Sequence, residues 1–152
     1  MNDNYNGHCF CGETTFNIIG KPLLRVFCHC TICQAFNQAP FADITLFRPE
    51  HVEMPTNDTV AYKAHTFPPI VQRGTCVKCS KPAIEYLTVL KKPNIVIVPS
   101  TNICNNIHLP APIMHIFYQS RVADIEDDLP KISGYFNSQF LLIHKLVNAL
   151  RR

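Results

Sequence analysis

The sequence has little charge and no long apolar run, and both shortages narrow the classes of protein it can belong to. Charged residues make up 16% of the 152 residues, the net charge is only +3, and Lys and Arg form no basic stripe. We therefore expect no nucleic-acid partner. No apolar stretch approaches the roughly 20 residues that cross a bilayer, so we expect no membrane partner either.

The N-terminal segment lacks the pattern of a secretory leader. Residues 1–5 include neither a positively charged region nor an apolar one. We therefore expect a cytoplasmic protein whose thiols are reduced. Its length is close to that of one ordinary domain.

Proline is frequent, with 12 residues, and it divides the chain into short apolar segments. Their composition and loose alternation predict strands. The C-terminus differs, because Leu142, Leu146 and Leu150 recur at helical spacing after a candidate N-cap at Ser138. We predict a mainly β protein whose C-terminal helix packs on the sheet edge or on a second subunit in a homodimer. Strands are expected at 14–19, 23–27, 41–47, 84–90, 95–98 and 114–118, and a helical turn at 31–35.

Cysteine is the most informative residue, because seven of the eight cysteines fall into three tight groups. A zinc site closed by protein takes four ligands, whereas a catalytic zinc usually takes three and keeps one position for water or substrate. Seven cysteines divide into four plus three, which predicts two zinc ions per chain. The groups are Cys9 and Cys11; Cys28, Cys30 and Cys33; and Cys76 and Cys79.

An even count of eight cysteines also permits a disulfide framework. Three observations count against it: there is no leader pattern, the 47% hydrophobic composition supports a core without staples, and Cys9 and Cys11 are too close in an extended segment to bridge easily. The eighth cysteine, Cys104, is either a spare ligand or a partly buried small apolar residue, and we favour the second interpretation.

The spacings within the groups predict which sulfurs share an ion. In an extended segment, residues i and i+2 face the same side, so Cys9 and Cys11 can ligate together, and Cys76-x-x-Cys79 has zinc-knuckle spacing. These four thiolates would make a structural site. Cys28, Cys30 and Cys33 combine both spacings and leave a fourth position open. Alternation points His29 away from Cys28 and Cys30, so we expect it to pack or hydrogen-bond instead of ligating.

These motifs resemble the glutathione-dependent formaldehyde-activating enzyme family, which also includes centromere protein V. The resemblance rests on Gly7-x-Cys9-x-Cys11-Gly12, Cys28-His29-Cys30-x-x-Cys33 and Cys76-x-x-Cys79, and it continues through 39–42, 112–117 and 128–130. It covers roughly residues 5 to 135, so we divide the domain into a zinc-binding part at 1–135 and a helical extension at 136–152. The resemblance implies a β-tent zinc-binding fold of short antiparallel sheets, a structural zinc at the four-cysteine group, and a catalytic zinc at Cys28, Cys30 and Cys33.

The resemblance also implies carbon–sulfur lyase chemistry, the reversible addition of glutathione to formaldehyde. Zinc with three thiolates acidifies water poorly, but it can hold a soft thiol as thiolate and present it to an aldehyde or another small carbonyl. The sequence departs from the family pattern at Gln34, Asn37 and Ser80-Lys81, which affects the substrate inference more than the fold inference. The alternative is a non-catalytic binding module with two structural zincs.

Further candidates follow from residue type alone. A proton must be carried to or from the carbonyl oxygen, and the carboxylates of glutathione call for cations. The proton-carrier candidates are His29, His51, His65 and Tyr62, and the candidate carboxylate partners are Arg48, Lys63 and Arg73. The alternative interpretation of each of these three cations is a solvated surface charge.

Overall fold

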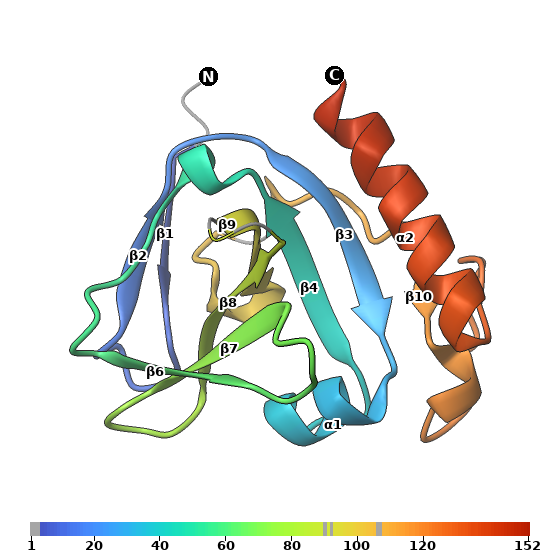
Figure 1. The fold of residues 1–152 in the computed structure, drawn as a ribbon, viewed down its shortest axis with the longest axis horizontal. Helices are drawn as coiled ribbons and strands as arrows, with labels where there is room; N and C mark the ends of the chain where they lie inside the picture. The colour runs from blue at the N-terminus through green and yellow to red at the C-terminus, as the bar shows by residue number, and fades with distance from the viewer. Residues whose placement is uncertain (1–3, 90, 92, 106–107) are drawn as a thin grey trace.

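The fold consists of two β-sheets and a C-terminal helix (Figure 1). The computed structural model describes residues 4–89, 91, 93–105 and 108–152. The smaller sheet contains, in spatial order, β1 (Tyr5–His8), β2 (Thr15–Ile18) and β5 (Val52–Glu53). The larger sheet contains, in spatial order, β10 (His115–Ile116), β3 (Pro22–Cys28), β4 (Ala42–Phe47), β9 (Pro93–Pro99), β8 (Pro82–Thr88), β7 (Val71–Cys76) and β6 (Val60–Ala64).

Helix α1 lies at the end of β3, and helix α2 lies along one edge of the larger sheet. The pairs of strands are antiparallel except for β10 and β3, which run parallel. Helix α1 follows β3, and α2 lies along the outer side of β3 (Figure 1). The helical elements are α1 (Thr31–Asn37), the 3-10 turns η1 (Pro49–His51), η2 (Ser100–Asn102) and η4 (Tyr118–Ser120), and α2 (Tyr135–Leu150).

Two apolar clusters hold α2 and the smaller sheet against the larger sheet. Strands β3, β4 and β9 contribute Val26, Leu46 and Ile97 to the first cluster, and Leu146 of α2 joins them. The second cluster lies between the sheets and includes Phe16 of β2. Because Phe16, Val26 and Leu46 are almost fully enclosed, these layers fix the positions of the strand ends that carry cysteines.

The predicted mainly β fold with a C-terminal helix is confirmed, but the helix begins earlier than expected. It starts at Tyr135 after Gly134, whose φ is +97°. The predicted cap at Ser138 is wrong: this residue is buried inside the helix, and its hydroxyl accepts a hydrogen bond from the Phe117 amide at 2.8 Å. Leu142 and Leu146 pack on the core as expected, whereas Leu150 faces solvent.

The strands that sequence patterns missed are polar or very short. Strands β6 and β7 carry Lys63 and Arg73 within their central residues, so they lack apolar alternation. The expected strand at 84–90 corresponds to β8, and its last residue, Leu90, lies outside the described residues, as do residues 1–3. No helix among the described residues is long and apolar enough to cross a membrane.

Candidate metal centres

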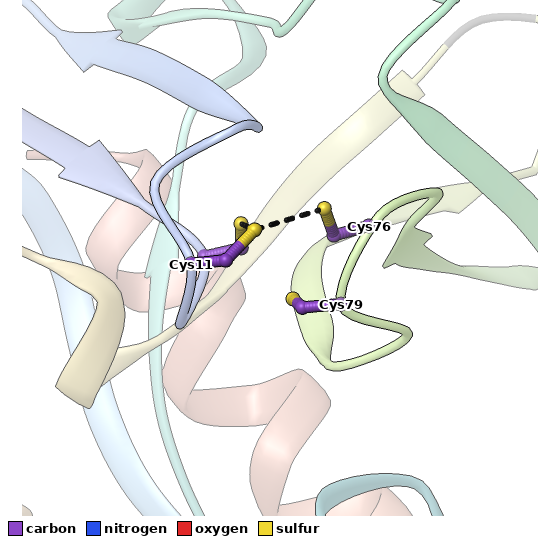
Figure 2. Close-up of side chains that lie close together, drawn as sticks. Cys11, Cys76 and Cys79 are labelled. Carbon is purple, nitrogen blue, oxygen red and sulfur yellow. Dashed lines mark hydrogen bonds between the residues drawn. The ribbon is translucent and has the colours of Figure 1, made fainter.

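The first cysteine group joins the two sheets. Cys9 and Cys11 lie in the turn after β1, Cys76 is the last residue of β7, and Cys79 lies in the turn before β8 (Figure 2). The Cys11 sulfur is 3.6 Å from that of Cys9 and 3.7 Å from that of Cys76, and all four sulfurs lie within 4.8 Å of one another. Tetrahedral zinc with bonds near 2.3 Å separates its sulfurs by about 3.8 Å. The group therefore fits one zinc ion.

Backbone amides favour the ionised sulfurs of this group. The Thr14 amide donates to the Cys9 sulfur at 3.4 Å, and the Lys78 amide donates to the Cys76 sulfur at 3.4 Å. Burial opposes ionisation of Cys76, but hydrogen bonds from Thr14 and from the amides of Cys79 and Lys78 lower its pKa to about 6. Thiolates are the form that binds metal.

The local geometry of Cys9 and Cys11 differs from the extended segment that the sequence suggested. Strand β1 ends at His8, and the Gly12 amide closes a turn by donating to the Cys9 carbonyl at 3.1 Å. Gly12 has φ +83°, a conformation that residues with a Cβ rarely adopt. A turn, not alternation along a strand, brings these two sulfurs together.

The second cysteine group lies where β3 meets α1. Cys28 ends β3, Cys30 is the N-cap of α1, and Cys33 is buried within the helix. Their sulfurs lie within 4.8 Å of one another, and the Cys33 amide donates to the Cys30 sulfur at 3.3 Å. Cys30 was expected on the strand, but the chain has already left β3 at that point. Three soft sulfur donors fit zinc.

Among the described residues, no fourth Cys, His, Asp or Glu joins this three-cysteine group. Neither His29 nor Cys104 belongs to either group. Cys104 instead lies beside the N-terminal sheet, where its amide donates to the Asn6 carbonyl at 2.8 Å. A tetrahedral ion held by these three sulfurs would therefore have one position that these protein donors do not fill.

A buried cation lies beside the three-cysteine group. Arg73 and Glu85 face each other across β7 and β8, with Arg73 Nε 3.0 Å from Glu85 Oε1, and Arg73 Nη2 lies 3.9 Å from the Cys33 sulfur. The expectation that Arg73 is a solvated charge is wrong, since only 10% of its side chain is exposed. Burial raises the pKa of Glu85 to about 7 despite the nearby guanidinium.

The sulfurs of the three-cysteine group are not equivalent. Hydrogen bonds from the Cys28 and Cys33 thiols lower the pKa of the Cys30 thiol to about 3, against the effect of burial, and the positive charge of Arg73 acts in the same direction. The hydrogen bond to Cys30 is also the main cause that raises the pKa of Cys28. Cys30 thus receives a backbone hydrogen bond from the Cys33 amide in addition to the effects of its neighbouring thiols.

A chain of imidazoles connects the ligand segment to the surface. His29 Nε2 lies 2.8 Å from His115 Nδ1, and His115 Nε2 lies 2.7 Å from Asp127 Oδ2. Burial, and then the charges of His115 and Arg121, lower the pKa of His29 to about 4, so this ring is neutral at pH 7. The Asp127 carboxylate accepts from His115 Nε2–H, and a single proton lies between His29 Nε2 and His115 Nδ1. This chain orients His29 between two cysteines, and spacing alone did not reveal His115 or Asp127 as its partners.

The residues that depart from the family pattern have structural roles. The side-chain amide of Gln34 donates to the backbone carbonyls of His29 and Ser120 at 2.7 and 2.8 Å, which ties α1 to the segment containing Cys28 and Cys30. The side-chain amide of Asn37 donates to the Cys33 carbonyl at 2.9 Å. Ser80 adopts φ +59° in the turn that carries Cys79.

The proton-carrier candidates His65 and Tyr62 contact different parts of the fold. His65 lies against Phe36 of α1 with ring centroids 6.3 Å apart, and burial, followed by the charges of Arg73 and Lys63, lowers its pKa. Tyr62 instead packs on Tyr86 at 5.1 Å, and burial raises its pKa to about 12.

Two further candidates lie far from the three-cysteine group. Arg48 and His51 follow β4 at its Phe47 end, whereas Cys28 pairs with Ala42 at the opposite end. The separation is on the order of 20 Å for about six residues of strand. Arg48 and His51 are therefore poor candidates for work at that group.

Comparisons with known proteins agree with this geometry. Residues 4–120 match the family model of the glutathione-dependent formaldehyde-activating enzyme. None of the curated proteins compared matches the chain. A crystal structure of a Rhodobacter sphaeroides protein from structural genomics has 13% sequence identity and a TM-score of 0.52, over 66% of this chain and 88% of that one.

At this identity, the likeness concerns the fold alone, and it agrees with the predicted β-tent class. The family resemblance noted in the sequence is confirmed, because the family model covers most of the chain. The chain belongs to the glutathione-dependent formaldehyde-activating enzyme family.

Proposed function

We propose that the protein is a zinc-dependent carbon–sulfur lyase that reversibly adds glutathione or a similar small thiol to formaldehyde or another small carbonyl. The observation that carries this proposal is the three-cysteine group, whose sulfurs converge within 4.8 Å without a fourth Cys, His, Asp or Glu among the described residues. In this proposal Cys28, Cys30 and Cys33 hold the catalytic zinc. Cys9, Cys11, Cys76 and Cys79 hold a structural zinc.

Zinc bound by the three cysteines would supply a soft Lewis acid that keeps the thiol substrate as thiolate. The protein residues provide the surroundings. The Cys33 amide and Arg73 direct positive charge toward the sulfurs, at 3.3 Å from Cys30 and 3.9 Å from Cys33. This charge offsets the net negative charge of three thiolates and one divalent ion.

The reaction forms one carbon–sulfur bond. The thiolate sulfur attacks the aldehyde carbon, the carbonyl π electrons move to oxygen, and that oxygen takes one proton; the reverse reaction returns the proton and releases the thiolate. We assign the proton transfer to His65, because it lies beside α1 and its pKa is lowered from the usual value by burial and then by Arg73 and Lys63. Lys63 is the candidate partner for a substrate carboxylate.

Exchange measurements test the proposal directly, because thiols and formaldehyde also combine without an enzyme. The rate of exchange between formaldehyde hydrate and S-(hydroxymethyl)glutathione can be measured by NMR with ¹³C-labelled formaldehyde. We expect the zinc-loaded protein to accelerate exchange, Cys30→Ser to abolish the acceleration, and Cys104→Ser to retain it. An exchange rate equal to that of the uncatalysed reaction would overturn the proposal.

The second candidate function is a non-catalytic module with two structural zincs. The burial of Cys28 and Cys33 favours it, since structural sites are closed. Cobalt substitution separates the two. A thiol that enters the coordination sphere should intensify the thiolate charge-transfer bands, and 2-mercaptoethanol compared with glutathione separates general thiol affinity from recognition of the tripeptide. Unchanged bands with both thiols would favour the module.

Three other expectations stay predictions. Residues 136–152 are proposed as an extension of the domain at 1–135, and the protein is proposed to be cytoplasmic, as reduced thiol ligands require. The predicted homodimer has a candidate interface on α2.

A further inference from the structure

Helix α2 presents a stripe of large apolar side chains to solvent. Its buried side contains Ser138, Leu146 and Ala149. On the opposite side, 84% of Phe136, 73% of Phe140 and 56% of Ile143 are exposed. The full stripe, which we call the α2 seam, consists of Phe136, Phe140, Ile143, Val147 and Leu150.

The spacing of the α2 seam is typical of paired helices. Its members follow one another at intervals of four, three, four and three residues. This is the heptad pattern that places one narrow stripe against a second helix. A helix that served only as a surface layer would have polar residues at these positions.

The area of the seam is sufficient for a weak dimer. An exposed phenylalanine offers about 200 Å², so five apolar side chains from each of two copies would bury on the order of 1,000 Å² in total. An apolar patch of several hundred Å² on one chain is at the upper limit for a monomer.

We propose that the α2 seam pairs in antiparallel orientation with the α2 seam of a second copy. Ile143 lies at the middle of the stripe, so a two-fold axis there would put Phe136 against the second copy's Leu150 and Phe140 against its Val147. Each large side chain then meets a smaller one.

The charges at the two ends of α2 are complementary in this orientation. The segment that leads into α2 (Figure 1) contains the exposed acids Glu126 and Asp128, beside an ion pair between Arg121 and Asp124. The C-terminal end of α2 is followed by the exposed basic residues Arg151 and Arg152. Antiparallel pairing brings each acidic segment toward the two arginines of the other copy.

Two other arrangements fit less well. Parallel pairing would stack Phe136 on its own copy and collect four arginines from Arg151 and Arg152 at one end. Membrane-surface helices carry many Lys and Arg on the polar side, whereas α2 between its ends has only Lys145. The seam also lies outside residues 4–120, the part that matches the family model.

Sedimentation equilibrium over micromolar to submillimolar concentrations tests the proposal on the zinc-loaded full chain. We expect a reversible dimer whose dissociation constant rises at least 10-fold in Phe140→Glu. The matched control is Phe67→Glu, which places the same charge on a still more exposed phenylalanine away from α2 and should leave the dimer unchanged. A monomer throughout, or a dimer that Phe140→Glu does not weaken, would overturn the proposal.

A charge reversal tests the orientation with variants that leave the seam intact. Arg151→Glu combined with Arg152→Glu should weaken the dimer several-fold, and adding Glu126→Lys and Asp128→Lys should restore it. Failure of the second pair to restore dimerisation would overturn the antiparallel arrangement. Co-sedimentation with anionic phosphatidylserine vesicles, lost in Phe140→Glu and without a dimer in solution, would identify the seam as a membrane contact and also overturn the proposal.

Discussion

The two cysteine groups have similar donors but differ in what they join. The four-cysteine group links a turn after β1 to the β7–β8 turn, with Cys11 and Cys76 separated by 65 residues. The three-cysteine group is confined to the junction of β3 and α1. An ion in the first group would close a long loop and couple metal binding to folding, whereas an ion in the second would constrain little chain. The distance along the sequence between the cysteines therefore distinguishes the group proposed to stabilise the fold from the group proposed for chemistry.

The largest expected effect comes from removing a long-range ligand. Cys76→Ser should yield insoluble or molten protein, because structural zinc contributes on the order of 10 kcal/mol in small domains. Circular dichroism, thermal melting and metal analysis measure this outcome. A cooperatively melting Cys76→Ser variant with undiminished metal content would contradict the structural assignment.

The corresponding change in the local group should be much milder for the fold. Cys30→Ser should lose one zinc per chain and all catalysed exchange, yet melt cooperatively, because its ligands span only six residues and constrain the unfolded chain little. Metal analysis beside a thermal melt checks the prediction. Collapse as complete as that of Cys76→Ser would mean that the two groups do not differ.

An intermediate effect is expected from Arg73, the buried cation beside the three-cysteine group. Arg73→Met leaves Glu85 buried without its partner, which should cost about 3–5 kcal/mol of unfolding free energy. It should also weaken zinc at the three-cysteine group roughly 10-fold to 100-fold, as loss of an outer partner commonly does. Chemical denaturation and chelator competition measure the two effects.

Arg25→Met is the matched control, since it breaks a partly exposed Arg25–Asp43 pair elsewhere on β3 and β4. Zinc affinity should be unchanged in this variant. If Arg25→Met and Arg73→Met weaken zinc equally, the proximity of Arg73 to Cys33 has no special role.

The smallest effect concerns the turn that carries Cys79. Ser80 has φ +59°, and this conformation costs a residue with a Cβ about 1–2 kcal/mol. Glycine would remove this cost, but part of the gain would be lost because glycine has a larger backbone entropy in the unfolded chain. Ser80→Gly should therefore raise the unfolding free energy by about 0.5 kcal/mol. Ser133→Gly, at a position without positive φ, should lower it instead. A lower denaturation midpoint for Ser80→Gly would contradict this interpretation.

Local spacing predicted much of the candidate site. The sulfurs of Cys28, Cys30 and Cys33 converge as the spacing required, although a strand end and a helix cap bring them together and not one strand face. The family motifs and the C-terminal helix were also readable from the sequence. The prediction of a cap at Ser138 was wrong because a serine hydroxyl can either cap a helix or accept a hydrogen bond from a neighbouring loop. In this structure it accepts from the Phe117 amide.

By itself, the sequence determined which cysteines lie close together within each of the three groups, because residues within five positions of one another are held close by the chain itself. Only the tertiary structure decided that Arg73 and Glu85 lie beneath Cys33, that His115 orients His29, and that α2 leaves an apolar seam exposed. These contacts join residues 40 and 86 positions apart in the first two cases. Such pairs are set by strand order and register, and no local pattern encodes them.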